Sequence, residues 1–436
     1  MLLDMCTNHR HGMSVSCVLA AAAIVSCSRA HPDAGGDSGS ATRPPTLSAV
    51  RTETLSSPAG ASSSEPQLTA SDRGVILSWI ERNSRSTHTL KFAERHASGW
   101  TAPTTVASGD NWFVSDADPP VVFRRPDGTL VANWLVSTNR KLEGSDLHLT
   151  YSQDNGKTWA RSFLPHHDGT QGQHAFPSFF ELPDDRLGLV WLDARAQAAN
   201  PEDLDASMSL RYAAFDRSWK QTADATVDTR VCECCSTTTA VTADGVLTAF
   251  RDRTEEEIRD NVVSRLENGK WSESTPLHND NWEVDACPVN GPALSARGRE
   301  VVAAWFTVKN DQGQAWAAFS SDSGRTWGLP IQLDDGASLG RVDVELLDDG
   351  SAVATWVEVA DNRAQFRLRR VGPSGSKSAP VTIASVPGTG LRGFPRIALY
   401  GGELIFAWTE QASGNDADNE RALVVSTATA RMPGTR

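Results

Sequence analysis

Four cysteines stand where their thiols could form disulfides or hold a metal. Three of them, Cys232, Cys234 and Cys235, share one short segment, and the fourth is Cys287. An even number of thiols in an oxidising compartment favours disulfides, and four cysteines allow three pairings. Thiolates are also preferred ligands of Cu(I) and Zn, with Cys232, Cys234 and Cys287 as the ligands in that case. A redox or catalytic thiol is the third alternative, and the sequence leaves all three open.

Acidic, basic and imidazole groups gather in a second set of segments. Residues 250–253 read FRDR, residues 191–195 read WLDAR, and His174 follows the pair His166 and His167, which we expect on an exposed loop. Arginine binds a carboxylate through two parallel hydrogen bonds, and a partly buried Asp or His can transfer a proton. The candidate catalytic groups are therefore Asp252, Asp193 and His174, and the candidate ligand-binding groups are Arg251, Arg253, Arg195, Arg392 and Arg396.

Apolar segments that end in an aromatic residue recur along the chain and must position these groups. A repeat of a few tens of residues that contains several short strands and turn signals is typical of a β-propeller. We predict an all-β propeller of four-stranded antiparallel blades, seven in number, with six as the alternative. The aromatic residues follow one another at intervals of 51 to 59 residues and are Trp79, Trp134, Trp191, Phe250, Trp305, Trp356 and Trp408.

The last repeat lacks a fourth strand of its own. Its third strand ends near Ala430, whereas residues 46–55 (TLSAVRTETL) form an unassigned strand before the first repeat. Pairing of these two segments would close the ring and remove an exposed sheet edge. We therefore expect the N-terminal strand to complete the last blade.

Polar residues are expected to meet around the mouth of the propeller channel. In antiparallel blades the first strands start on the face where the second strands end, and convergent polar groups in a cleft commonly bind ligands. A merely solvated ring of charges is the alternative. The strand starts supply Glu65, Asp116, Asp118, His174, Cys234, Asp285, Arg341, Asp343, Arg392 and Arg396, and the strand ends supply Glu81, Arg82, Asp193, Arg195, Arg251, Asp252, Arg253, Glu358 and Glu410.

Two turns share the pattern S-x-D-x-G-x-T-W, at residues 152–159 and 320–327. The pattern resembles the Asp-box, or BNR repeat, of sialidases and related propellers. Asp can accept backbone N–H bonds in such a turn, Gly allows positive φ, and Trp packs back between strands. The resemblance implies a sialidase-like propeller over residues 45–436, with the structural Asp-box residues Asp154, Gly156, Trp159, Asp322, Gly324 and Trp327.

The resemblance to sialidases does not extend to their catalytic pattern. Members of that family carry an arginine triad, a Tyr nucleophile with a Glu partner, and an Asp acid/base, and an early F/Y-R-I-P motif supplies the first arginine. That motif does not occur in this sequence, and the three tyrosines, Tyr151, Tyr212 and Tyr400, are poorly placed in the repeats for a nucleophile. The sequence therefore predicts that ordinary sialidase catalysis is lacking.

The N-terminal region resembles a bacterial lipoprotein signal. Arg10 precedes an apolar run over residues 15–25, and Cys27 follows it as the expected lipidated residue. The run is too short to span a bilayer as a permanent helix. We expect a signal peptide at 1–27 that includes Cys6 and Cys17, a flexible polar linker at 28–44, and outer-membrane anchoring with the domain facing the periplasm or the cell surface.

The formal net charge of −13 is unfavourable for binding nucleic acid or an anionic membrane surface. We therefore predict an exported, monomeric propeller lipoprotein that binds a small acidic or carbohydrate ligand, or a partner protein, at the channel mouth. One alternative is an exo-α-sialidase or related glycoside hydrolase with a rearranged site. The other is a periplasmic copper or zinc protein that uses the cysteines. Whether the protein is an enzyme is left open.

Overall fold

The computed structural model describes residues 51–84, 86–139, 143–199, 206–388, 391–412 and 423–431. All of them belong to the second of two compact units, Pro45–Arg436. The predicted signal peptide and linker, with Cys6, Cys17 and the lipidation site Cys27, lie outside these residues. Among the described residues, no helix combines the length and the apolar character that crossing a bilayer requires.

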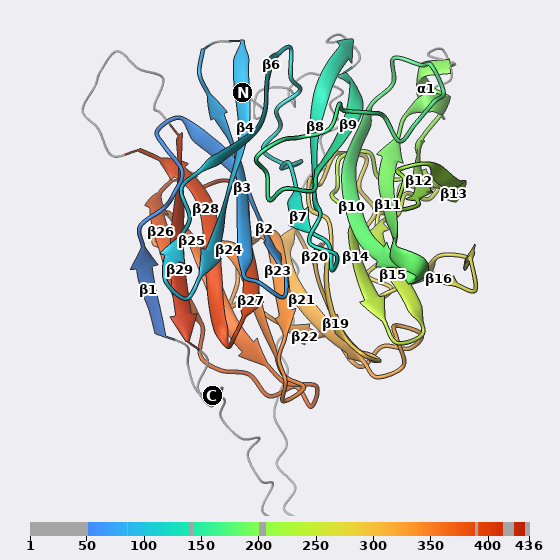
Figure 1. Ribbon diagram of the computed structural model, residues 1–436. Coiled ribbons are helices and arrows are strands. Elements are labelled where there is room, and N and C mark those ends of the chain that lie inside the picture. Colours follow the sequence, from blue (N-terminus) through green and yellow to red (C-terminus); the bar gives the residue numbers. More distant parts are fainter. Residues whose placement is uncertain are drawn as a thin grey trace, which may run out of the picture. The chain divides into compact units, whose positions relative to one another are not determined.

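The described residues form seven antiparallel sheets, which are the seven blades of a propeller (Figure 1), so the six-bladed alternative is excluded. Each blade begins with its innermost strand. Blade 1 contains β2 (Ser63–Ala70), β3 (Val75–Arg82), β4 (Thr87–His96), β5 (Gly99–Trp100) and β6 (Thr104–Asp110). Blade 2 contains β7 (Val122–Arg124), β8 (Leu130–Asn139) and β9 (Gly144–Ser152). Blade 3 contains β10 (His174–Leu182), β11 (Arg186–Asp193), β12 (Met208–Phe215) and β13 (Gln221–Val231), with η1 (Pro183–Asp185) and α1 (Arg195–Ala199) between strands.

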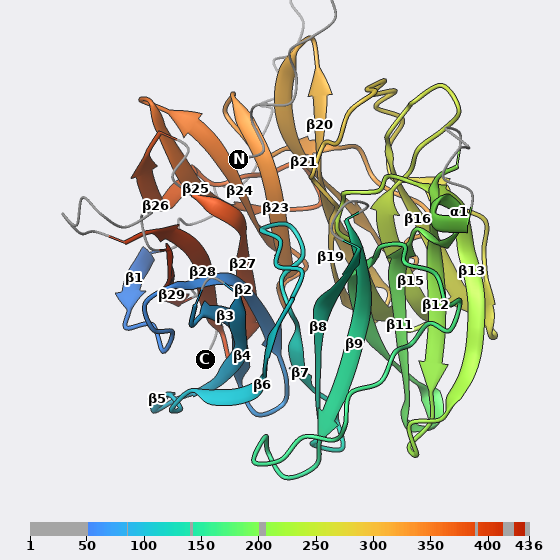
Figure 2. The same cartoon turned by 90° about the horizontal axis from the view of Figure 1, so that it is seen from above.

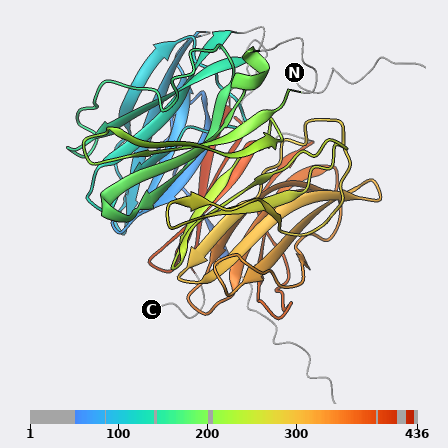
Figure 3. The same ribbon diagram turned by 90° about the vertical axis from the view of Figure 1, so that its right-hand side faces the viewer.

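The other four blades repeat this order of strands, and Figure 3 shows them in yellow-green to red. Blade 4 contains β14 (Thr238–Thr242), β15 (Gly245–Arg251), β16 (Asn261–Glu267), β17 (Lys270–Trp271) and β18 (Thr275–Pro276); blade 5 contains β19 (Ala293–Arg297), β20 (Glu300–Lys309), β21 (Gln312–Ser320) and β22 (Ile331–Gln332); blade 6 contains β23 (Ser338–Leu346), β24 (Ala352–Ala360), β25 (Arg363–Val371) and β26 (Val381–Pro387); blade 7 contains β27 (Arg392–Tyr400), β28 (Glu403–Gln411), β29 (Leu423–Arg431) and β1 (Arg51–Leu55).

The N-terminal strand closes the ring, as the sequence predicts. β1 pairs antiparallel with β29, from Arg51 opposite Arg431 to Leu55 opposite Thr427. A second link lies beside it, where the backbone N–H of Val425 donates to Ser63 Oγ at 2.9 Å. In Figures 1 and 2, β2 of the first blade lies beside β27 of the last. Closure thus covers the edge of β29, which would otherwise carry unpaired backbone groups.

Blade 2 departs from the predicted four strands, because only three form a regular ladder. The segment after β9 makes a single bridge, in which Leu149 and Phe163 exchange backbone hydrogen bonds of 2.8 and 2.9 Å. Pro165 follows and has no N–H to donate, which accounts for the short pairing.

The aromatic residues that mark the repeat fill the space between neighbouring blades. Trp356 of blade 6 shares a buried cluster with Val302 and Ala304 of blade 5, and Trp305 of blade 5 shares one with Leu247 of blade 4. Trp79 of the first blade lies in a cluster with residues of the last blade. Each aromatic ring therefore packs towards the preceding blade, and the 51–59-residue spacing is the distance along the chain between equivalent interfaces.

A carboxylate two residues after the tryptophan satisfies its buried indole N–H in three blades. Trp356 Nε1 donates to Glu358 at 2.7 Å, and Glu358 also pairs with Arg367 at 2.9 Å. Burying an indole without an acceptor would cost free energy, so the acid and the nearby cation stabilise the aromatic core. The same three-part arrangement consists of Trp79, Glu81 and Lys91 in blade 1 and of Trp191, Asp193 and Arg195 in blade 3.

Both Asp-box turns have the geometry that their sequence predicts. Asp322 accepts from the backbone N–H groups of Arg325 and Thr326 at 3.0 and 2.9 Å, and Asp154 accepts from Thr158 N–H at 2.9 Å. Gly156 and Gly324 have φ of 83° and 78°, and Trp159 packs edge-on against Phe92 of the preceding blade. Hydrogen bonds from the Thr158 hydroxyl and the Thr158 backbone N–H lower the pKa of Asp154 to about 2. The Asp-boxes are therefore structural turns that fix the ends of third strands.

Candidate functional site

The innermost strands carry β-bulges close to the mouth of the channel. Register shifts occur in β2, β10, β23 and β27. Three residues in these bulges have positive φ although they are not glycine, namely Glu65 (57°), Phe176 (56°) and Arg341 (53°). Such conformations cost free energy and are concentrated at functional sites, where a bulge changes the direction of a side chain.

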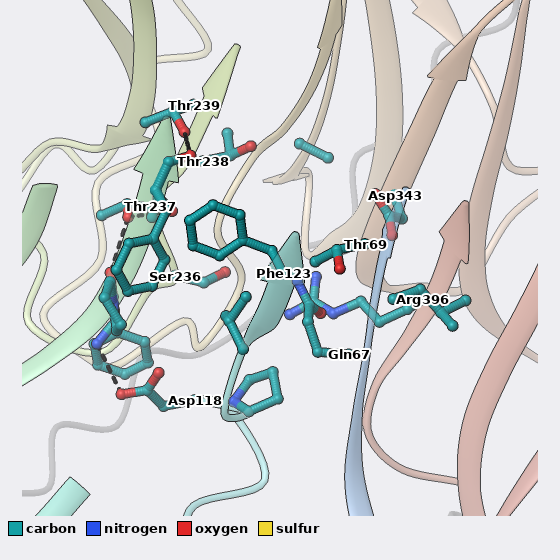
Figure 4. Close-up of a pocket in the computed structure, with 18 of the residues that line it drawn as sticks. Gln67, Thr69, Asp118, Phe123, Ser236, Thr237, Thr238, Thr239, Asp343 and Arg396 are labelled. Carbon is teal, nitrogen blue, oxygen red and sulfur yellow. Dashed lines mark hydrogen bonds between the residues drawn. The ribbon is translucent and has the colours of Figure 1, made fainter. Parts of the chain in front are cut away.

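All seven blades contribute to a cavity of about 320 Å³ at the centre of the ring. This volume lies within the usual range of small-molecule sites. Figure 4 shows polar side chains from opposite sides of the ring directed towards it. Its polar lining consists of Gln67, Thr69, Asp118, Ser178, Ser236, Thr237, Thr238, Thr239, Asp343 and Arg396, and its apolar wall includes Phe123 and Phe179.

Arg396 is the cation of this cavity. Its side chain extends from β27 towards Gln67 and Thr69 in Figure 4. Its Nε is buried without a hydrogen-bond partner, and no ion pair joins its guanidinium to another described residue. Burial lowers its pKa, but a guanidinium stays protonated in proteins. Arg396 therefore offers a positive charge and free N–H donors inside a concave site.

Two carboxylates face Arg396 without forming a salt bridge to it. Asp118 accepts from Phe176 N–H at 2.7 Å, and Asp343 accepts from Ile397 N–H at 3.1 Å. Burial raises the pKa of Asp118 to about 7, although the Phe176 N–H and the Arg396 charge oppose the shift. Burial likewise raises the pKa of Asp343. Asp118 can therefore donate or accept a proton near neutral pH.

The rest of the cavity lining suits a ligand with both polar and apolar faces. Phe123 and Phe179 pack against each other with ring centroids 5.2 Å apart. Gln67 Oε1 is buried without a donor, whereas Thr237 and Thr239 direct their hydroxyl groups to backbone carbonyls of β10. A flat ligand could place its C–H face on the aromatic rings and its polar edge on Arg396 and Gln67.

Buried acids in and around the cavity predict a dependence of stability on pH. Burial raises the pKa of Asp118 to about 7 and that of Glu345 to about 8, so the folded state holds protons that the unfolded chain releases near its ordinary values. Their stabilising contribution is present below those ordinary values and is lost as pH rises through about 7 to 8. We therefore expect the midpoint of chemical unfolding to fall as pH rises from the ordinary values of 3.8 and 4.5 to about 7 and 8, and to level off above that range. Glu345→Gln should flatten the fall and the exposed-site control Glu300→Gln should not; equal slopes in all three proteins would contradict this account.

Arg251 and Arg253, the candidate ligand-binding arginines of blade 4, bind other groups of the protein itself. Arg251 is 1% exposed and donates to the carbonyl oxygens of Asn290, Arg259 and Phe306. Arg253 pairs with Glu233 and Glu257. Arg251 thus links two adjacent blades and does not line the cavity.

His174, Asp193 and Arg195 meet in one buried network in blade 3. His174 is wholly buried and contacts Asp168 through Nε2 and the Ser145 carbonyl through Nδ1, both at 3.0 Å. Asp193 accepts from Arg195 and from the indole of Trp191. This network fills the contact between β10, β11 and the preceding loop, and it does not line the cavity.

The expectation of an exposed His166–His167 pair is wrong for His166. This side chain is 4% exposed and stacks on His174 with ring centroids 3.6 Å apart. Its Nε2 accepts from Leu147 N–H at 3.2 Å, and burial lowers its pKa to about 3. The imidazole is therefore neutral and serves as a hydrogen-bond acceptor, which explains why it tolerates burial.

The remaining candidates lie outside the cavity lining. Asp252 is half-buried beside Asp228 and Asp260, and burial raises its pKa to about 6. Arg392 is exposed at the start of β27. The tyrosines have structural contacts: Tyr151 stacks on Trp219, Tyr212 packs against Trp271, and Tyr400 donates to the Asp72 carbonyl.

The four described cysteines are free thiols that lie close together. Cys232 and Cys235 are buried, Cys234 is half-buried, and Cys287 is exposed. The sulfur of Cys232 lies 3.9 Å from that of Cys234 and 3.4 Å from that of Cys235. The segment that carries them leads directly into Ser236 of the central cavity.

Sequence reasoning named Arg396, Asp118 and Asp343 but missed the lining residues further along the inner strands. The sequence marks these lining residues as polar residues at alternate positions after the start of the strand, as in Gln67 and Thr69. Period-two alternation marks one face of a strand, so this pattern was available in the sequence.

No protein-family model matches this chain, and no curated protein matches its sequence. Solved structures resemble it over most of its length. A mutant of NanB sialidase from Streptococcus pneumoniae is 10% identical, with a TM-score of 0.45 over 82% of this chain and 83% of that chain. The polysaccharide lyase Uly1 is 9% identical, with a TM-score of 0.49 over 84% and 89% of the two chains. The α-L-arabinofuranosidase Arb93A from Fusarium graminearum is 13% identical, with a TM-score of 0.46 over 72% and 93%.

Proposed function

We propose that this propeller binds a small acidic carbohydrate, such as a sugar with a carboxylate, in the cavity at the centre of the ring. The observation that carries the proposal is Arg396, a guanidinium in a concave site whose Nε has no protein partner. Arg396 forms no salt bridge with the described residues, and a ligand carboxylate would supply acceptors for its N–H groups as well as a negative charge. The aromatic wall of Phe123 and Phe179 supports a ring-shaped ligand.

Replacement of Arg396 by glutamine should weaken the binding of an acidic sugar. Hydrogen bonds to charged groups contribute about 1.5–3 kcal/mol, so affinity should fall by about 10- to 150-fold. Calorimetric titration with glucuronate and N-acetylneuraminate, and with neutral glucose as the comparison ligand, measures this change.

The matched control is Arg299→Gln, an exposed arginine on another blade that pairs with Asp244. It should leave affinity unchanged. Arg392→Gln tests whether the exposed mouth contributes to binding as well as the interior. Equal affinity of wild type and Arg396→Gln for both acids, or no binding of either acid by the wild type, would contradict the proposal.

A glycoside hydrolase with a rearranged site is the second candidate, and Asp118 favours it. A carboxyl group whose pKa burial raises to about 7 is suited to general acid catalysis at neutral pH. This candidate requires turnover of a uronide or sialoside that Asp118→Asn abolishes while binding persists. Absence of turnover over a broad panel of glycosides would leave the protein as a binding module.

We also propose that the chain is an exported lipoprotein anchored through Cys27. The support is the apolar run over residues 15–25 that precedes this cysteine. Mass spectrometry of the mature chain tests it, since a lipid on Cys27 is expected and an unmodified N-terminus from cleavage elsewhere would contradict it.

A further inference from the structure

We infer that Cys232, Cys234 and Cys235, with Cys287 beside them, form a site for one thiophilic d10 cation, either Zn²⁺ or Cu(I). The three sulfur atoms of Cys232, Cys234 and Cys235 all lie within 4.8 Å of one another. Cys287, which comes from the loop before blade 5, lies beside Cys234. The four thiols therefore converge from two separate segments of the chain.

The sulfur separations fit coordination to one metal. Zinc–sulfur bonds of about 2.3 Å in a tetrahedron place sulfur atoms about 3.8 Å apart. The observed separations from Cys232 are 3.4 Å to Cys235 and 3.9 Å to Cys234. Cys232 and Cys235 also have the C-x₂-C spacing that occurs in structural zinc sites.

Hydrogen-bond donors around the sulfur atoms support bound thiolates. The backbone N–H of Asn290 donates to Cys235 Sγ at 3.3 Å, and Arg259 Nη1 donates to Cys232 Sγ at 3.5 Å. Both donor residues are buried. Such outer groups orient the ligands of metal sites and tune their charge.

The charged side chains around the cysteine cluster give independent support for a bound metal. Arg253 and Arg259 share the carboxylates of Glu233 and Glu257, whereas no carboxylate of the described residues pairs with the buried Arg251. This set of three arginines and two glutamates keeps one net positive charge. A metal–thiolate centre is anionic and would supply the missing counter-charge, while two disulfides would not.

The two metals differ in the number of thiolates that they need. Structural zinc sites take four ligands, so Zn²⁺ would use Cys287 together with the other three. Cu(I) also selects soft thiolates, and the three clustered sulfur atoms would hold it without Cys287. Because Cys287 is exposed and Cys234 is half-buried, the metal can enter from the surface.

The experiment uses the full chain purified without chelator and compares its native and denaturing masses before and after thiol alkylation. One equivalent of Zn or Cu that is lost on denaturation, with Cys232, Cys234, Cys235 and Cys287 then open to alkylation, is expected. A metal-free protein that is lighter by four hydrogens and resists alkylation without reductant would overturn the site in favour of disulfides. Free thiols that take up neither Zn²⁺ nor Cu(I) on titration would overturn it as well.

Variants then locate the site and distinguish the metals. Cys232→Ser should weaken binding of either metal by more than ~100-fold, and Arg259→Gln should weaken it by about 10- to 100-fold. Cys287→Ser should lower the affinity for Zn²⁺ but leave that for Cu(I) unchanged. Arg396→Gln is the control, because it alters the central cavity and should keep the full metal content. This inference is thus tested separately from acidic-sugar binding.

Discussion

Replacement of Arg251 by methionine is expected to lower the free energy of unfolding by about 3–5 kcal/mol, since buried charged groups in hydrogen-bond networks have effects of this size. The guanidinium is 1% exposed and joins β15 to two segments of the next blade through the Asn290 and Phe306 carbonyls. Methionine fills a similar volume but leaves these acceptors unpaired. It also removes the cation 5.0 Å from the ring of Trp282.

The midpoint of urea unfolding, followed by tryptophan fluorescence, measures this loss. Arg253→Ala is the matched control, because this neighbouring arginine lies nearer the surface, at 16% side-chain exposure, and pairs with two glutamates. Partly exposed ion pairs contribute about 1 kcal/mol or less. A midpoint for Arg251→Met as high as that of Arg253→Ala would show that the carbonyl contacts do not stabilise the fold.

Replacement of Glu358 by alanine should cost a similar amount. Glu358 is 4% exposed, accepts from Trp356 Nε1 at 2.7 Å and pairs with Arg367 at 2.9 Å. The variant would leave a buried indole N–H and a partly buried guanidinium without their acceptor. Breaking a buried pair at one partner costs about 3–5 kcal/mol. Thermal and urea unfolding of the purified variant provide the measurement.

The chain offers a control with the same local sequence. Glu410 also follows a tryptophan by two residues, but Trp408 Nε1 is buried without a hydrogen-bond partner. Glu410→Ala should therefore cost only about 1 kcal/mol, mainly through its hydrogen bond with Ser426. The double variant Glu358→Ala/Arg367→Met should recover part of the Glu358→Ala loss, since it removes the unpaired charge. Equal losses in the Glu358 and Glu410 variants would contradict the role assigned to the indole.

Much of the fold was predictable because it repeats. The spacing from Trp79 to Trp408 indicates seven blades, and the unmatched segment at residues 46–55 indicates closure. Each of these signals is local or periodic, so a short stretch of sequence carries it. The missing fourth strand of blade 2 was not predictable in this way, because its pairing depends on how residues beyond Trp159 reach β9.

The candidate site was predictable only in part. Positions at strand starts placed Arg396 and Asp118 near the channel, and both line the cavity. Position in the repeat does not decide which arginine stays free, however. Arg251 and Arg396 have the same side chain, but Arg251 donates to carbonyls of the next blade, whereas Arg396 lines the central cavity and its Nε has no acceptor.

The sequence by itself determined the propeller, its closing strand and the geometry of the Asp-box turns, and it favoured seven blades over six. These features follow from period, alternation and turn chemistry, which act over a few residues at a time. Only the tertiary structure decided that the sulfur atoms of Cys232, Cys234 and Cys235 gather, with Cys287 of another segment beside Cys234. It also decided that His166 is a buried acceptor and that Arg396 Nε lacks a hydrogen-bond partner. The physical reason is that burial and pairing depend on contacts between blades, and residues distant in sequence make those contacts.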